Sequence, residues 1–340
     1  MNSIIEREES VRMENGRFLN TVPTPQGIET ENIWSTLHSW FFDGKLRTPR
    51  VEIPVQRLDS PVVGDGATHV TWMGHSTLLI ELDGKTVLLD PVFSSNASPF
   101  SWLPPRSFYP EMPISPEAID HVDAVVISHD HYDHLDMHSI KALADKTDRF
   151  IVPLAVGGHL RRWGIAEEKI TELGWWKSTT LDSITLTATP TRHFSGRSLM
   201  DKNRTLWAGW AIRGRDNTLY FGGDSGFFPG FKEIGERLGP FDLTMLECGA
   251  YDPAWPNIHM FPEQTAQAHI DLRGKALMPI HWSRFDLALH PWNASVERLE
   301  TAARKQNLTI VTPRIGQRFA MNGELPATAW WREISDTPSP

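Results

Sequence analysis

The chain has 340 residues, of which 40% are hydrophobic and 22% charged, an ordinary composition for a globular protein with a full core. Its formal net charge is −9 and no segment forms a basic stripe, so the sequence argues against a nucleic-acid-binding protein. Cys248 is the single cysteine, which excludes a disulfide framework within the chain.

The N-terminus lacks the apolar core of a signal peptide. No stretch approaches the ~18 consecutive apolar residues that a membrane-spanning helix needs. We therefore expect a soluble, cytoplasmic protein. Peripheral membrane contact and a homodimer are both left open by the sequence.

Residues 1–66 contain clusters of proline and glycine and show little hydrophobic periodicity. We therefore expect an irregular N-terminal arm with one short helix around residues 32–42. Residues 67–320 are expected to form the main domain and residues 321–340 a C-terminal tail.

Apolar, β-branched runs and helical spacings alternate along the main domain. Strands are predicted in residues 69–74, 77–82, 86–90, 123–128, 183–190, 205–214, 217–223, 242–249 and 275–282. Turns are predicted at Asp83-Gly84 and across residues 215–217. Helices are predicted in residues 137–147, 262–274 and 295–307. Strand runs with helices interposed in both halves indicate an α/β fold in which two sheets pack together with helices outside, a four-layer αββα sandwich.

The run 123–128 leads directly into "SHDHYDHLD", residues 128–136. His129 and His131 are two residues apart in an extended segment, so their side chains point the same way and can bind one metal ion. Asp133 and His134 follow and can reach a second ion. Imidazole and carboxylate without thiolate favour zinc over iron or manganese.

Four ligands cannot complete two metal sites, and three later residues can supply the rest. His193, Asp224 and His281 each follow a predicted strand. Ligand-type side chains gather at the carboxyl ends of strands in open α/β sheets. The sequence therefore predicts one metal centre with seven ligands.

The order H-x-H-x-D-H followed by His, Asp and His resembles the metallo-β-lactamase superfamily over roughly residues 67–320. The resemblance implies that one metal ion is held by His129, His131 and His193. A second ion is then held by Asp133, His134 and His281, and Asp224 bridges the two. It also implies the αββα sandwich with the site at one edge between the sheets.

Further stretches resemble the N-acyl-phosphatidylethanolamine phospholipase D branch of that superfamily. They are "FLNTVP", "TWMGHSTLLIELDGKTVLLDPVFS", "ISHDHYDHLD", "ELGWWKS", "HMFPEQTAQAH" and "PIHW". The resemblance implies hydrolysis of a small-molecule or lipid phosphodiester. We expect a metal-bridging hydroxide to attack phosphorus, because two divalent ions leave a net positive site that favours an anionic substrate.

Two side chains are candidate catalytic residues. Asp133 is expected to orient the nucleophile, and His259, which matches a histidine of the phospholipase-like branch, to protonate the leaving group. A surface histidine at the start of a helix is the competing interpretation of His259. His75 is predicted either to orient a metal ligand or to be a structural histidine.

Other charged and aromatic side chains lie near these residues. Arg192, Arg197 and Arg284 could contact phosphate, although solvated loop charges are the simpler interpretation. Aromatic residues in connecting segments could form an apolar rim for an acyl chain or touch a membrane, or they could fold over the core. They are Phe100, Trp102, Phe108, Trp175 and Trp176.

Two other functions fit the same ligand set. A lactonase acting on a sugar phosphate or an acyl-lactone would use the same metals on a carbonyl group. A non-catalytic metal-binding sensor is disfavoured, because such proteins are expected to have lost ligands. Fold alone does not decide the substrate.

Overall fold

A computed structural model describes residues 11–26, 47–58, 66–100, 102–198 and 200–335. The helix expected around residues 32–42 lies outside these residues. The first described segment holds a short antiparallel pair, β1 (Met13–Glu14) and β2 (Arg17–Phe18).

The first large sheet has the strand order β16-β3-β4-β5-β6-β7-β8 within the described residues. Its strands are β3 (His69–Trp72), β4 (Leu78–Leu82), β5 (Lys85–Leu89), β6 (Val122–Val126), β7 (Thr147–Pro153), β8 (Ile170–Leu173) and β16 (Arg318–Ala320). Strands β16 to β5 pair antiparallel and strands β5 to β8 pair parallel. The Asp83-Gly84 turn joins β4 to β5 with both residues at positive φ, as tight hairpins require.

The second large sheet has the order β15-β14-β13-β12-β11-β10-β9. Its strands are β9 (Ser178–Leu181), β10 (Ile184–Thr189), β11 (Gly209–Arg213), β12 (Thr218–Phe221), β13 (Phe241–Glu247), β14 (Gly274–Ile280) and β15 (Thr309–Ile310). The predicted hairpin across residues 215–217 is confirmed as the β11–β12 connection.

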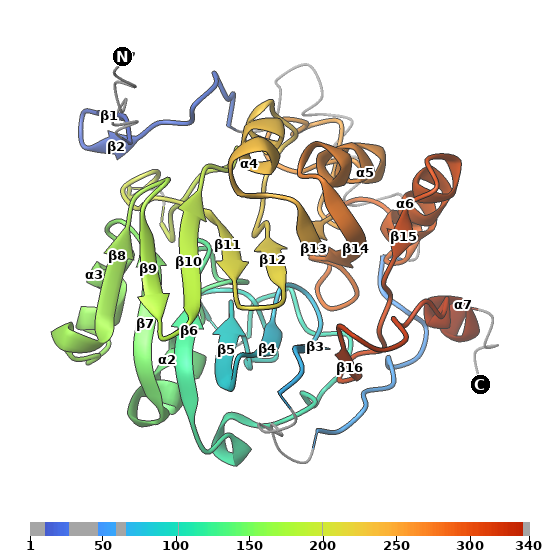
Figure 1. The fold of residues 1–340 in the computed structure, drawn as a ribbon, viewed down its shortest axis with the longest axis horizontal. Coiled ribbons are helices and arrows are strands. Elements are labelled where there is room, and N and C mark those ends of the chain that lie inside the picture. The colour runs from blue at the N-terminus through green and yellow to red at the C-terminus, as the bar shows by residue number, and fades with distance from the viewer. Residues whose placement is uncertain (1–10, 27–46, 59–65, 101, 199, 336–340) are drawn as a thin grey trace.

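Helices cover the outer faces of the two sheets (Figure 1). They are α2 (Met137–Leu143), α3 (Gly157–Arg162), α4 (Gly230–Leu238), α5 (Pro262–Asp271) and α6 (Ala294–Lys305), with the short 3-10 turns η2 (Pro116–Ala118), η3 (Ala144–Lys146) and η4 (Glu167–Lys169). Helix α7 (Trp330–Ser335) lies at the side of the sandwich near β16 (Figure 1). The predicted αββα sandwich is therefore confirmed.

Alternation along the strands explains the layers. In β4, Leu78 and Ile80 belong to the core between the sheets, whereas Leu79 belongs to the core under the helices. Leu88 in β5 also faces the helices, where Ile140 of α2 packs in the same cluster. Successive side chains of a strand point to opposite faces, so a continuous apolar run serves a sheet that is buried on both sides.

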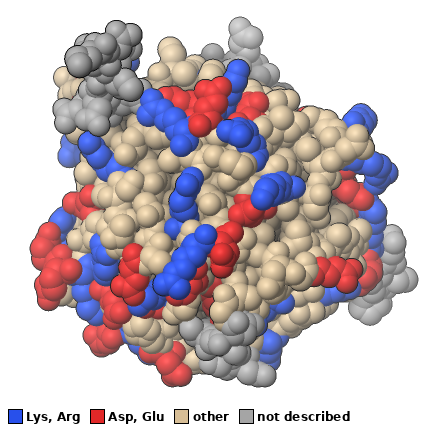
Figure 2. Space-filling model, in the orientation of Figure 1, with Lys and Arg blue, Asp and Glu red and all other residues tan. Residues whose placement is uncertain are grey.

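None of the helices in the described segments is both long enough and apolar enough to cross a membrane. Figure 2 shows lysine, arginine, aspartate and glutamate interspersed over the face drawn.

Candidate metal centre

Four strands deliver the predicted ligands to one edge of the sandwich. The segment after β6 carries His129 to His134, and the segments after β10, β12 and β14 carry the other three predicted ligands. All seven side chains come together in one cluster, although their sequence positions span more than half of the main domain.

Three histidines form one half of the cluster. His129 Nε2 lies 2.9 Å from His131 Nδ1, and His193 Nε2 lies 3.3 Å from the same atom. His129 and His193 are almost completely buried. Three imidazole nitrogens facing one point are the donor set of a tetrahedral metal site with one open position.

Asp133, His134 and His281 form the other half. Asp133 Oδ2 lies 3.3 Å from His281 Nε2 and 3.5 Å from His134 Nε2. Asp224 lies between the halves. Its Oδ2 is 3.0 Å from His281 Nε2 and 3.2 Å from His134 Nε2, and 3.8 Å from Nε2 of both His129 and His193. This single oxygen therefore reaches both halves, as a bridging ligand must.

The donor atoms of the cluster are better arranged to bind divalent cations than to form hydrogen bonds with one another. His134 Nε2, His281 Nε2 and Asp224 Oδ1 are buried without a hydrogen-bond partner of acceptable geometry. Buried polar atoms are normally satisfied, so an unsatisfied group of metal-ligand type points to a cation. The residues present fit a site for two metal ions.

The histidines of the cluster have pKa values shifted in opposite directions. Burial disfavours the imidazolium of His281, but the charges of Asp224 and Asp133 outweigh burial and raise its pKa to about 10. Burial and the neighbouring imidazoles hold the pKa of His129 well below its usual value. The cluster thus attracts positive charge to the half that contains Asp133 and lies nearer to the carboxylate of Asp224.

A second layer of side chains fixes the ring orientations. His134 Nδ1 donates to Asp90 Oδ2 over 2.7 Å, which leaves the Nε2 lone pair of the neutral ring for a metal ion. Asp90 also accepts from the backbone N–H of Ser128. His75 Nε2 lies 3.0 Å from Asp133 Oδ2, so His75 contacts a predicted ligand, one of the two predictions made for it.

The backbone beside His281 is held in an unusual conformation. His281 and His75 have φ values of 62° and 53°, a region that non-glycine residues rarely adopt. His281 N donates to His75 O, and Trp72 Nε1 donates to the same carbonyl. Such conformations persist only where the surroundings impose them, and they cluster at functional sites.

His259 lies at the edge of the cluster and not on the outer surface. Its ring centroid is 5.1 Å from that of His193 and 5.3 Å from that of His281. His259 Nδ1 donates to Glu247 Oε2 over 3.1 Å, and Glu247 Oε1 accepts from Met260 N. The buried carboxylate of Glu247 therefore orients the ring of His259 against both halves of the cluster.

A family model described as a beta-lactamase superfamily domain matches residues 85–282. The chain belongs to the metallo-β-lactamase superfamily. An uncharacterized protein of Mycobacterium tuberculosis is 43% identical over 333 residues, which cover 96% of this chain and 88% of the relative. N-acyl-phosphatidylethanolamine-hydrolyzing phospholipase D 1 of Caenorhabditis elegans is 34% identical over 264 residues, which cover 73% of this chain and 74% of the relative.

Solved structures of superfamily proteins share the fold. An isothiocyanate hydrolase from Delia radicum gut bacteria superposes with a TM-score of 0.59 at 20% identity, and the match covers 74% of this chain and 98% of that one. A metallo hydrolase from Ignicoccus hospitalis gives a TM-score of 0.56 at 19% identity and covers 76% of this chain and 100% of that one. Family membership together with the buried cluster assigns this superfamily member to the metal-dependent hydrolases.

The three arginines hydrogen-bond to neighbouring segments of the chain. Arg197 donates to the carbonyls of Asp130 and Leu135 and so braces the segment that carries His131 to His134. Arg284 is buried and donates to two backbone carbonyls, of Val92 and Ser94. Arg192 binds the N-terminal segment through Thr24 and Pro23. These hydrogen bonds give each guanidinium group a role in holding the fold.

The aromatic residues of the connecting segments divide into two groups. Trp175 is buried, and Phe108 and Trp176 are partly buried against the core. Phe100 and Trp102 are 56% and 69% exposed and stack on each other with ring centroids 5.8 Å apart. Hydrogen bonds from Asn96 and Ser98 to Phe100 O hold this loop.

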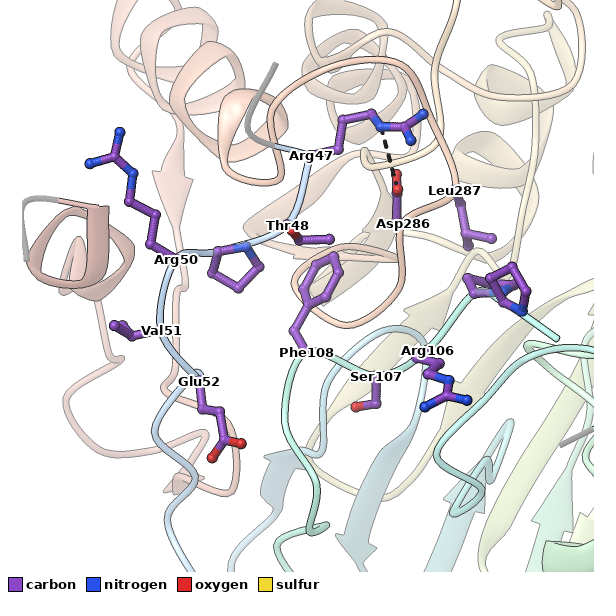
Figure 3. A pocket seen from close by; sticks show the side chains of 13 residues that line it. Arg47, Thr48, Arg50, Val51, Glu52, Arg106, Ser107, Phe108, Asp286 and Leu287 are labelled. Carbon is purple, nitrogen blue, oxygen red and sulfur yellow. Dashed lines mark ion pairs between the residues drawn. The ribbon is translucent and has the colours of Figure 1, made fainter. Parts of the chain in front are cut away.

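A depression of about 780 Å³ is lined in part by residues 104–108, which follow that loop in the sequence (Figure 3). Its apolar lining includes Val51, Phe108 and Leu287, and Arg47 pairs with Asp286 over 3.4 Å at its edge. The neighbouring Phe285 ring lies 5.3 Å from that of His75. Phe285 is the residue before Asp286 of this lining, and through His75 it is linked to the predicted ligand Asp133.

Proposed function

We propose that this superfamily member is a zinc-dependent phosphodiesterase of phospholipase D type that hydrolyses an N-acyl-phosphatidylethanolamine or a closely related lipid phosphodiester. The observation that carries the proposal is the position of His259, which Glu247 holds against both halves of the metal cluster. The similarity to the phospholipase D of Caenorhabditis elegans supports the choice of substrate.

The charge of the centre favours an anionic substrate. Asp133 and Asp224 are the two carboxylates among the seven predicted ligands, so two divalent cations leave an excess of positive charge. When bound, the ions would supply Lewis acidity toward the phosphoryl oxygens and toward a water molecule. Preorganised positive charge stabilises a transition state that gathers negative charge on those oxygens.

Two residues of the chain are proposed to orient the attacking water and to protonate the leaving oxygen. In the hydrolysis, a bond forms between a water oxygen and phosphorus, and the bond from phosphorus to the leaving alkoxide breaks. We infer that Asp133, whose Oδ2 lies among His75, His134 and His281, orients that water, and that the proton lost by the water passes to the solvent. The leaving oxygen needs a proton, and a protonated His259 donates one from Nε2 while Glu247 holds Nδ1.

The exposed aromatic loop suits a lipid substrate. Phe100 and Trp102 present an apolar pair to solvent, and amphipathic aromatic rings are favoured at the interface of a bilayer. The apolar part of the depression, formed by Val51, Phe108 and Leu287, is a candidate site for an acyl chain. Peripheral membrane contact through this loop is part of the proposal, and the homodimer stays a prediction.

The test uses the full chain, stripped with a chelator and reloaded with zinc, in oxygen-18-labelled water. We expect release of phosphatidic acid that carries the label on its phosphate, because water attacks phosphorus. The matched control substrates are an acyl-lactone and a phospholipid whose phosphodiester is replaced by a non-hydrolysable phosphonate. Chelation should abolish the activity, and zinc should restore it.

The alternatives give different results in the same assay. Hydrolysis of the lactone with no release of phosphatidic acid would assign the protein to the lactonases. Two bound metal ions with no hydrolysis of either substrate would indicate the metal-binding sensor.

A further inference from the structure

The N-terminal segment formed by residues 18–26 lies against the metal centre. Phe18 is buried, and its N–H donates to the carbonyl of Asn203 in the loop that follows His193. Arg192 ties down the other end of the segment through Thr24 and Pro23. The segment is therefore fixed on both sides of His193, more than 160 residues away in sequence.

Asn20 binds both backbone groups of His193. The N–H of His193 donates to Asn20 Oδ1 over 3.1 Å, and Asn20 Nδ2 donates to His193 O over 2.7 Å. Gln26 Nε2 adds a second, longer bond to the same carbonyl, at 3.3 Å. Within the described part of the chain, the N–H and the carbonyl of His193 form hydrogen bonds with these side chains and with no backbone group.

Asn20 is itself rigidly held. Its Oδ1 also accepts from Trp207 Nε1 over 3.2 Å, and Trp207 is completely buried. The same indole N–H donates to the carbonyl of Thr191, two residues before His193. Asn20 and Trp207 thus fix the backbone on which His193 is mounted.

The imidazole of His193 is oriented separately. Its Nδ1 donates to the carbonyl of Ile258 over 2.9 Å, which leaves Nε2 facing His131 Nδ1 and Asp224 Oδ2. With the ring fixed by Ile258 and the backbone fixed by Asn20, the position of Nε2 follows. A displacement of the backbone would move this donor atom out of the three-histidine set.

We propose that Asn20 is a positioning residue of the metal centre, through which the N-terminal segment sets the affinity of the three-histidine site for its metal ion. The proposal rests on the two-metal centre but not on the identity of the substrate. Residues that orient a metal ligand typically change metal affinity by about 10- to 100-fold when they are replaced.

The test measures zinc affinity of the chelator-stripped full chain by competition with a chromophoric chelator. We compare the variants Asn20→Asp and Asn20→Ala with the wild type. The first is nearly isosteric and keeps the acceptor for His193 N, but it places a carboxylate oxygen against His193 O. We expect one of the two zinc-binding steps to weaken by about 10- to 100-fold in both variants, with the other changed by about threefold or less.

Two controls separate ligand positioning from loss of folding. Thr24→Val removes one of two contacts of the same segment with Arg192, keeps the bond from Arg192 to Pro23 O and does not touch His193, so it should bind both zinc ions as the wild type does. The absorption spectrum of the cobalt-loaded protein should change for the Asn20 variants and not for Thr24→Val. Folded Asn20 variants that bind both ions with wild-type affinity and an unchanged cobalt spectrum would overturn the proposal, whether or not the phospholipid is hydrolysed.

Discussion

Carboxylates that hold imidazoles decide the chemistry at the scale of single residues. Glu247 holds His259, and Asp90 holds His134. Each pairing leaves the second ring nitrogen of the histidine facing the cluster. The two carboxylates therefore set which ring nitrogen of each histidine faces the cluster.

Replacement of His259 tests its role in proton transfer. We expect His259→Gln to lower kcat by about 100-fold or more, because the leaving oxygen loses its proton donor. Both metal ions should remain bound. His121→Gln is the matched control, since His121 forms a similar pair with Asp148 on the exposed surface. Loss of metal from the His259 variant would show instead that the residue is a ligand.

Replacement of Asp90 tests the orientation of His134. We expect Asp90→Asn to weaken zinc binding by about 10- to 100-fold, because the two oxygens of Asp90 accept from Ser128 N and from His134 Nδ1, and an amide keeps only one acceptor oxygen. The measurement is competition with a chromophoric chelator, with Asp148→Asn as control. Equal affinities in the two variants would contradict the account.

Residues that act locally could be predicted from the sequence, and residues that act across the fold could not. His193 and Asp224 were recognisable because each follows a strand-like run. Glu247 and Asp90 are also acidic residues at the end of apolar runs, which is the signal that could have identified them. Asn20 has no such signal, because its partner His193 is 173 positions away.

At the scale of elements, alternation in the strands and spacing in the helices predicted most of the architecture. The predicted helix 262–274 corresponds to α5, which ends at Asp271, and the predicted helix 137–147 is divided into α2 and η3. Helix ends depend on tertiary contacts more than on local sequence. The two-residue strands β1 and β2 leave no periodic pattern to recognise.

Helix α5 makes the stability of the fold sensitive to acid. Burial lowers the pKa of His269, whose Nδ1 lies 2.7 Å from Thr244 Oγ1 of β13, from 6.5 to about 4. The imidazole of His269 therefore binds a proton at a higher pH in the unfolded chain than in the folded chain. The contribution of the neutral, buried His269 to the free energy of unfolding is complete above about pH 6.5 and is lost as the pH falls through about 4.

The measurement is urea unfolding of the metal-free chain at about pH 7.5 and about pH 5. The loss of unfolding free energy between these values should be smaller by about 2 kcal/mol in His269→Gln than in the wild type. His138→Gln, at an exposed position of α2, should leave the loss unchanged. A His269 variant with the same acid sensitivity as the wild type would refute this assignment.

Helix α7 contributes Trp330 to a cluster of tryptophan rings next to the ligand His281. Trp330 stacks on Trp282, the residue after His281, with ring centroids 5.4 Å apart, and Trp282 stacks on Trp72 at the same distance. We expect Trp330→Ala to cost about 3–5 kcal/mol of unfolding free energy, because it leaves a large cavity. Chemical denaturation measures this cost. A loss below about 1 kcal/mol would show that α7 is not part of the core.

At the scale of the whole molecule, the metal centre joins the two sheets. Its ligands follow β6 of one sheet and β10, β12 and β14 of the other, so metal ions bound there crosslink the sandwich. Ions that bind only the folded state stabilise it by about 2.7 kcal/mol at a concentration 100 times Kd. The Tm of the chain should therefore fall on chelation and return with zinc. An unchanged Tm would contradict a centre that bridges both sheets.

The metal content of the chain tests the two-metal centre most directly. After removal of metal, reloading with zinc and removal of the excess, mass spectrometric metal analysis should find two ions per chain in the wild type. In His281→Ala the intact three-histidine set should still retain one ion. A single ion in the wild type, or two ions in the His281 variant, would contradict the assignment of these seven residues to one centre for two metal ions.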